Sequence, residues 1–123
     1  MELNNTGFSS KIYQLKLNQL NGFDLGISGA LVDKSGNFYC TASAENTSDW
    51  YNDGEIIGSA IGCLNIHDLK QETSIQFESF VIEDTNTPIK LEAICETSDK
   101  NRFFVASDND GEKSMLYEIE LSL

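Results

Sequence analysis

Basic residues, histidine and long apolar runs are all scarce in this sequence. Eight Lys and Arg residues stand against 20 Asp and Glu residues, so the formal net charge is −12. That charge argues against nucleic-acid binding and against docking on anionic lipid, because both need a basic footprint. The single histidine, His67, excludes a zinc site with several His ligands from one chain.

The sequence also lacks the features of a targeted or membrane-spanning protein. No apolar run reaches the roughly 18 residues that a transmembrane helix needs. The start, MELNNTGFSSK, has no basic region followed by an apolar stretch, so it does not read as a signal peptide. We therefore expect a cytoplasmic protein without a membrane partner.

The three cysteines, Cys40, Cys63 and Cys95, do not form a recognisable metal or redox motif. They are far apart in sequence, and each lies within an apolar run. This placement predicts small buried core residues in a reducing compartment.

What the sequence does have is a strong β-pattern. Hydrophobic residues make up 40% of the 123 positions, enough to form the core of a single domain, 1–123. Short apolar runs alternate with clusters of Gly, Asn, Asp and Ser, which predicts an all-β fold. The predicted strands are 11–17, 27–33, 37–44, 59–66, 74–82, 91–97, 102–107 and 115–121.

These strands repeat along the chain. The segment ISGALVDKSGNFYCTASAEN aligns with LEAICETSDKNRFFVASDND. Aligned pairs are Ala30 with Ala93, Phe38 with Phe103 and Leu64 with Ile119. A repeat of about 64 residues made of four strands is typical of a β-propeller blade. Two unrelated hairpins that happen to look alike are the alternative.

The repeat predicts two antiparallel four-stranded blades. The first blade spans about 27–82, and the second spans about 91–121 with strand 11–17 as its outer strand. In this scheme the N-terminal strand completes the last blade. Two blades cannot close a ring, because each blade buries both faces against neighbours. We therefore expect either assembly with other copies, favouring a homotrimer of six blades, or a place within a larger propeller.

Two segments carry a resemblance to a known family. The first is Ala42–Leu64 and the second is Lys90–Asp110. The positions that correspond to the family's two motifs are Ala42, Ala44, Glu45, Asn46, Thr47, Tyr51, Asp53, Gly54, Gly58, Ser59, Ala60 and Gly62, then Lys90, Glu92, Ala93, Asp108 and Asp110. They resemble the C-terminal part of a bacterial family of uncharacterised β-propeller proteins, distantly similar to the phytase-like esterase domain. Asn46 and Ala93 depart from that family's acidic residue and glycine.

The loop 45–58 is the first candidate binding site. Carboxylates interleaved with aromatic side chains suit a divalent cation or a hydroxyl-rich ligand. The alternative is that the aromatic rings pack the loop onto the sheet while the acids face water. The candidate ligand-binding residues are Glu45, Asp49, Trp50, Tyr51, Asp53 and Glu55.

The second candidate is a metal site at Glu92, Asp108 and Asp110. Strands 91–97 and 102–107 are antiparallel neighbours, so the end of one lies near the start of the other. Carboxylates gathered there suit Ca²⁺. The alternatives are a surface ion pair of Glu92 with Lys90 or Arg102, and an Asx-turn at 108–110.

These observations predict a binding module of the propeller type that assembles into a ring and binds an unidentified small ligand, with Ca²⁺ as the candidate cofactor. A metal-dependent hydrolase of the phytase-like esterase kind is the alternative, with the same three acids as ligands. A truncated gene fragment without function of its own is the third. No nucleophile with a matching base is visible in the sequence, so catalytic residues are not assigned.

Overall fold

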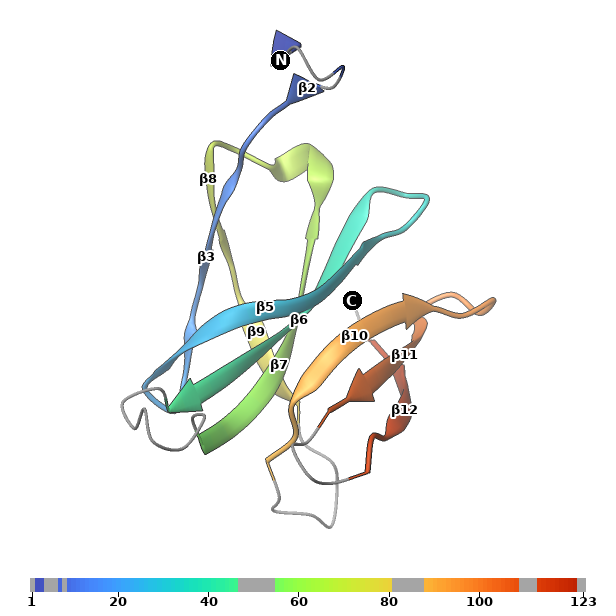
Figure 1. The fold of residues 1–123 in the computed structure, drawn as a ribbon. Coiled ribbons are helices and arrows are strands. Elements are labelled where there is room, and N and C mark those ends of the chain that lie inside the picture. The colour runs from blue at the N-terminus through green and yellow to red at the C-terminus, as the bar shows by residue number, and fades with distance from the viewer. Residues whose placement is uncertain are drawn as a thin grey trace.

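The chain folds into strands and turns in the computed structural model, which describes residues 2–3, 7, 9–46, 55–80, 88–108 and 113–121 (Figure 1). Those ranges hold no α-helix, only one turn of 3-10 helix, η1 (Ile66–Asp68), so none of their helices has the length or hydropathy to cross a membrane. The all-β prediction is confirmed. The strands are β1 (Glu2–Leu3), β2 (Ser9–Ser10), β3 (Gln14–Leu17), β4 (Gln19–Leu20), β5 (Phe23–Val32), β6 (Asn37–Asn46), β7 (Glu55–Asn65), β8 (Glu72–Ile75), β9 (Phe77–Phe80), β10 (Leu91–Glu96), β11 (Arg102–Ser107) and β12 (Leu116–Glu120).

Two sheets carry most of the structure. The larger has the order β4-β5-β6-β7-β9, and the smaller has the order β10-β11-β12. Every neighbouring pair in them is antiparallel. We call β5, β6, β7 and β9 the first unit, and β10, β11 and β12 the second unit. Both units follow chain order, as the predicted blades do.

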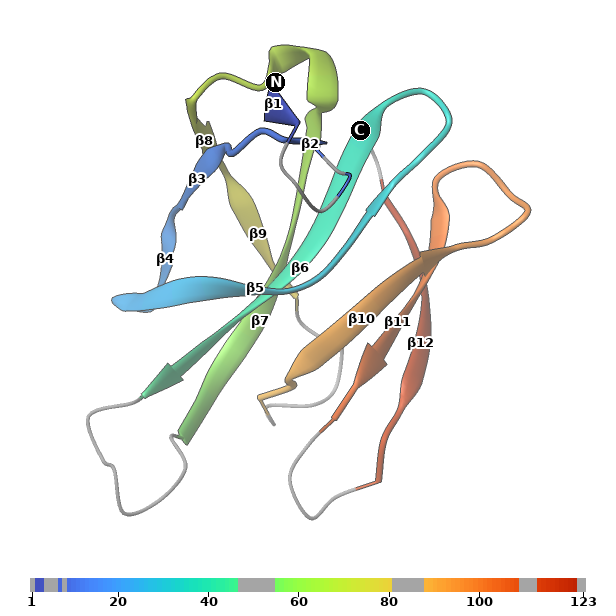
Figure 2. The same cartoon turned by 45° about the horizontal axis from the view of Figure 1, so that its top comes forward.

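The first unit is closed by the N-terminal strand. After Asn18, β3 leads into β4, and after Gln76, β8 leads into β9. β3 pairs with β8 in parallel, and both views place them side by side (Figures 1 and 2). The Asn18 side chain links the β3–β4 junction to the β8–β9 junction. It donates to the Phe77 carbonyl at 3.2 Å and accepts from the Phe77 N–H at 2.6 Å. The chain runs through β3/β4, β5, β6, β7 and β8/β9 with the direction reversing at each step. The first and fifth of these segments therefore run in the same direction, and β3 pairs with β8 in parallel.

The predicted place of the N-terminal strand is therefore wrong within this chain. The repeat places it beside 115–121, but it pairs with β8 and turns the first unit from an open blade into a nearly closed sheet. The reason lies in the barrel core, the buried cluster Cys40, Ala42, Ala60, Ile75 and Phe77. Three of these side chains are small, and Leu15 and Leu17 of β3 pack against them.

The second unit repeats the first in register. The Ile27–Ala42 pair of β5 and β6 corresponds to the Leu91–Ser107 pair of β10 and β11, in keeping with the repeat length that the sequence predicts. The β6–β7 and β11–β12 ladders correspond in the same way. Three of the four strands of the predicted repeat therefore recur with the same pairing. Its first strand is aligned one residue further on than predicted.

A β-bulge follows the equivalent pair in both units. The register shifts between positions 27 and 29 in β5 and between positions 91 and 93 in β10. Ser28 and Glu92 are the extra residues of these bulges, so they are structural equivalents. Since a bulge re-aims a side chain, Glu92 is placed by a backbone feature that both units share.

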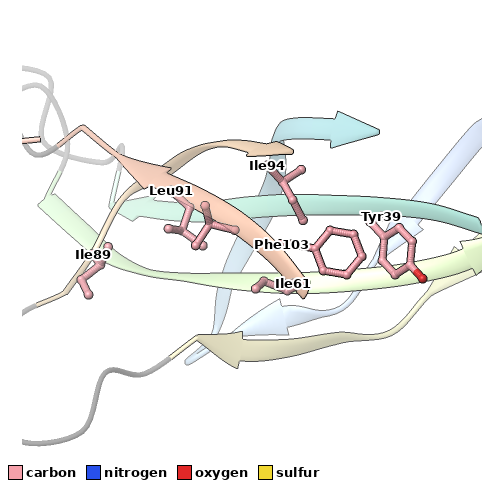
Figure 3. Close-up of a cluster of buried hydrophobic side chains, with 7 residues drawn as sticks. Tyr39, Ile61, Ile89, Leu91, Ile94 and Phe103 are labelled. Atoms are coloured by element: carbon pink, nitrogen blue, oxygen red, sulfur yellow. The ribbon is translucent and has the colours of Figure 1, made fainter. Parts of the chain in front are cut away.

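The two units pack face to face through the inter-sheet core, the buried cluster Tyr39, Ile61, Ile89, Leu91, Ile94, Phe103 and Val105. The rings of Tyr39 and Phe103 lie side by side, with centroids 4.5 Å apart (Figure 3). The two units approach closely at Gly29 of β5, where an added Cβ would lie 2.9 Å from the Ala93 Cα. The first strands of both units therefore touch through their backbones.

The N-terminal strand covers the face of the first unit that lies away from the second unit. In the second unit, Phe103, Val105 and Ile119 face the inter-sheet core. Their counterparts Phe38, Cys40 and Leu64 instead line the barrel core with Leu15 and Leu17. β3 and β8 thus cap the stack on the side of the first unit.

Candidate functional site

Three charged side chains meet near the start of β10. The Lys90 ammonium lies 2.9 Å from Oε1 of Glu45 and 3.6 Å from Oε1 of Glu92. Glu45 comes from the end of β6 and Glu92 from the bulge in β10. We call these three residues the lysine–glutamate cluster. It is the Lys90–Glu92 ion pair named above as an alternative to a metal site, with Glu45 added.

Asp108 lies next to this cluster through its backbone. Its N–H donates to the Lys90 carbonyl at 3.0 Å, and the Leu91–Ser107 pair sets the two strand ends beside each other. The Asp108 side chain is exposed. The predicted approach of Asp108 to the start of β10 is thus present. Asp110, the third predicted ligand, lies outside the described residues.

The cluster's charges are already partly balanced. The Lys90 side chain is 24% exposed and the Glu45 side chain 26%, so their attraction is only partly screened by water. The ammonium lies near both carboxylates and supplies a positive charge there. Within the described ranges, no three His, Cys, Asp or Glu side chains are grouped to hold a metal ion. Calcium binding stays a prediction.

Most of the predicted ligand loop, including Asp49, Trp50, Tyr51 and Asp53, lies outside the described residues. Glu55 begins β7, but its side chain also lies outside them. Of the six candidates, Glu45 is the one whose side chain is placed, and it belongs to the lysine–glutamate cluster.

A buried serine hydrogen-bonds the first unit to the start of the second unit, close to the lysine–glutamate cluster. Ser59 of β7 is 1% exposed. Its hydroxyl donates to the Ile89 carbonyl at 2.6 Å and accepts from the Leu91 N–H at 2.9 Å. Ser59 belongs to the small-residue run GSAIG, in which Gly62 leaves room for the Phe77 ring. That run of small residues therefore allows close packing.

A cleft opens at the other end of the sheets, between the β5–β6 and β10–β11 turns. We call it the turn cleft; its volume is about 750 Å³. Tyr39 and Phe103, which line it, also belong to the inter-sheet core. The other lining residues are polar or charged: Asp33, Lys34, Ser35, Asn37, Glu96, Thr97, Ser98, Asp99, Lys100, Asn101 and Arg102.

Equivalent side chains hold both turns. Asp33 accepts from the N–H groups of Ser35 and Asn37, each at 2.9 Å. Thr97, its counterpart one repeat later, accepts from the Asp99 N–H at 3.1 Å and donates to the Arg102 carbonyl at 3.0 Å. The walls of the turn cleft are therefore shaped by local hydrogen bonds.

Two titratable groups respond to this arrangement. The hydrogen bond from the Asn37 backbone is the largest cause that lowers the pKa of Asp33. Burial is the main cause that raises the pKa of the Tyr39 hydroxyl, and the neighbouring acidic groups of Cys63 and Asp33 raise it further. Tyr39 therefore stays a neutral phenol close to an ionised Asp33.

Sequence reasoning missed the turn cleft, although the signals were present. Asp33 opens the turn Asp-Lys-Ser-Gly, and Asp at the first position of a tight turn is a known anchor. Asn101 has a φ of +64° and Gly36 a φ of +85°, so both turns end in the left-handed region. What the sequence lacks is any indication that these two turns face each other.

Comparison with known protein families places the chain in a described family. The profile of a family of unknown function matches residues 2–121 of the chain. No curated protein and no solved structure matches the chain significantly.

Proposed function

The chain belongs to this family of unknown function, DUF6929, and from the geometry of its two units we propose that it is a binding module of the β-propeller type. The observation that carries the proposal is the turn cleft, which lies between equivalent turns of two stacked, repeated units. Binding residues concentrate on turns held by a rigid sheet scaffold.

The size and chemistry of the cleft support a small hydroxyl-rich ligand. A volume of about 750 Å³ falls in the range of small-molecule sites. Hydroxyl and amide groups of Ser35, Thr97, Ser98 and Asn101 supply donors and acceptors. Three cationic and three anionic side chains also line it, so neither sign dominates. A neutral polyol or sugar matches this mixed lining better than an ion.

The test is an NMR titration of the amide signals with glucose, myo-inositol and cellobiose. Each probe is added to about 10 mM, above the Kd of a millimolar site. We expect shifts in residues 33–37 and 96–103 and none in β3 or β8. Ser98→Trp fills the cleft without removing a turn hydrogen bond and should abolish the shifts. Ser114→Trp, at an exposed position away from the cleft, is the control. Shifts that are absent, or that persist in Ser98→Trp, refute the proposal.

Calcium dependence is a separate part of the proposal. Glu92, Asp108 and Asp110 remain the proposed ligands, and Lys90 competes with a cation for Glu92. If the site exists, millimolar Ca²⁺ stabilises the protein by about 1–3 kcal/mol, and Asp108→Asn with Glu92→Gln removes that gain. Identical melting curves in Ca²⁺, Mg²⁺ and chelator would leave these acids as surface and ion-pair residues.

Assembly into a ring of three copies also remains a proposal. It requires each copy to offer both outer faces to its neighbours, but β3 and β8 pack on one of them. A trimer therefore needs β3 to leave the barrel core. Light scattering decides this point: a trimer supports the ring, and a monomer with a cooperative melt overturns it.

A further inference from the structure

The outer edge of the second unit is open along β12. β12 pairs with β11 on one side, and no strand of the described ranges pairs with its other side. The Ser107 N–H donates to the Met115 carbonyl and the Leu121 N–H donates to the Asn101 carbonyl, both at 2.9 Å. Because bonded residues alternate in an antiparallel pair, positions 115, 117, 119 and 121 face β11.

The remaining positions of β12 therefore point their backbone groups away from β11. Leu116, Glu118 and Glu120 each direct an N–H and a C=O towards the open edge. All three residues are exposed. Such a row of unpaired backbone groups is a template for another strand.

The first unit has a strand paired at the edge that corresponds to the open edge of β12. In the first unit, β9 pairs with β7 along Ser59–Gly62. The correspondence of Leu64 with Ile119 places the counterpart of the β9-paired part of β7 at 114–117, where the Tyr117 ring contacts Phe80. The open edge of β12 continues beyond this stretch through Glu118 and Glu120, so a partner strand that starts at 114–117 can extend along them. The two units share strand order, bulge and turns, but the second lacks the strand that corresponds to β9 among the described residues. We propose that a partner chain supplies this fourth strand by pairing with β12.

The side chains along β12 define the chemistry of that strand. Tyr117 and Ile119 are half-buried and lie on the core-facing side, whereas Glu118 and Glu120 lie on the exposed side. Glu118 is already 3.5 Å from the guanidinium of Arg102 on β11, so Glu120 is the carboxylate that calls for a basic partner residue. The partner strand consequently alternates apolar residues opposite Tyr117 and Ile119 with a polar residue opposite Glu118 and a basic residue opposite Glu120. The net charge of −12 favours a basic partner and repels a second β12 edge. The occupant is an extended basic–apolar segment of another protein.

A peptide of the sequence SSKIYQLKLN, that of residues 9–18, has this pattern and serves as the probe. Its Tyr, Leu and Leu alternate with Gln and Lys, and its charge is positive. Binding is measured by fluorescence anisotropy of the labelled peptide on the full chain. We expect saturable binding that weakens as salt is raised.

Backbone methylation of the peptide separates strand pairing from simple attraction and leaves the protein unchanged. The Gln14 and Lys16 amides of the peptide would face β12, and the Leu15 amide would face away. Methylating the first two should weaken binding at least about tenfold, or about 1.4 kcal/mol. Methylating the Leu15 amide should change it by less than about threefold, because that N–H makes no bond to β12.

The protein side is tested by Glu118→Pro. Its N–H faces the open edge, so proline leaves the ladder with β11 intact and removes a donor for the partner. Glu118→Gln is the matched control, which removes the charge and keeps the N–H. We expect Glu118→Pro to lose peptide binding and Glu118→Gln to keep most of it.

Three results overturn the proposal. The first is equal binding of all methylated peptides. The second is equal binding of a peptide whose two Lys are replaced by Glu, which rejects the basic chemistry. The third is that the wild-type chain does not bind the peptide because it is a dimer, and that Glu118→Pro makes it a monomer. That result makes a second copy the occupant of the edge.

Discussion

Removing the Ser59 hydroxyl tests the joint between the two units most directly. Ser59→Ala leaves the Ile89 carbonyl and the Leu91 N–H without the partner that joins them to β7. Leu91 is fully buried and Ile89 is 7% exposed, so water does not readily replace the hydroxyl. An unsatisfied buried polar group costs about 1–3 kcal/mol. With two groups affected and some relaxation, we expect a loss of about 2–4 kcal/mol in the free energy of unfolding.

The assay is urea unfolding followed by circular dichroism, with a thermal melt beside it. For 123 residues the unfolding entropy is about 0.26 kcal/mol per kelvin, so Tm should fall by about 8–15 °C. Ser74→Ala is the control, because Ser74 is exposed on β8 and should stay within about 0.5 kcal/mol of the wild type. A loss below about 1 kcal/mol for Ser59→Ala refutes the reasoning, since the bridge would then carry no net stability.

Three further predictions concern packing, thiol reactivity and pH. Gly29→Ala should cost about 1–3 kcal/mol in urea unfolding, because its Cβ would meet backbone atoms 2.9 and 3.1 Å away. Gly26→Ala on the same strand, with no atom within 4 Å of the new Cβ, should not be destabilising; equal losses in both variants contradict the close approach. Burial is the main cause that raises the pKa of the Cys40 thiol to about 12. Iodoacetamide at about pH 8 should therefore modify the exposed Cys95 long before Cys40. Mass spectrometry of the digested peptides measures the two rates. Asp33 has a pKa below its unfolded value of about 3.9, so its contribution to stability is present at neutral pH and lost as pH falls through the native pKa. A pH titration of the Asp33 carboxyl, followed by carbon NMR, should give a pKa below the unfolded value. A pKa equal to or above it contradicts the hydrogen bonds of the turn.

The hairpins and their repeat were predictable because their signals are local. Turn residues, β-branched residues and alternation lie within a few positions of each other, and the predicted strand 102–107 has the observed bounds. The Asn21-Gly22 turn between β4 and β5 was overlooked, although Asn-Gly is a strong hairpin signal. Both residues have positive φ, +50° and +83°. Missing this turn made β5 appear to begin at 27 when it begins at Phe23.

The candidate sites were less predictable because they depend on which surfaces meet. The cysteines show this clearly: Cys40 is buried as expected, Cys63 is half-buried, and Cys95 is exposed on β10. An apolar run alone predicts burial, but a side chain on the open face of a strand has no second sheet to cover it. The lysine–glutamate cluster was foreseen only as an alternative pair, and Glu45 joined it through the pairing of distant strands.

Charge, strand pattern and repeat determined that this protein is an acidic all-β chain built from two equivalent units. These properties depend on composition and on neighbours a few positions apart, which the sequence displays directly. Tertiary structure alone decided that β3 closes the first unit, that the two turns enclose a cleft, and that no described strand pairs with the outer edge of β12. Each of these depends on segments far apart in the sequence competing for the same edges and faces. The outcome of that competition follows from the fit of small side chains such as Cys40 and Ala42 against Leu15 and Leu17, which no local pattern records.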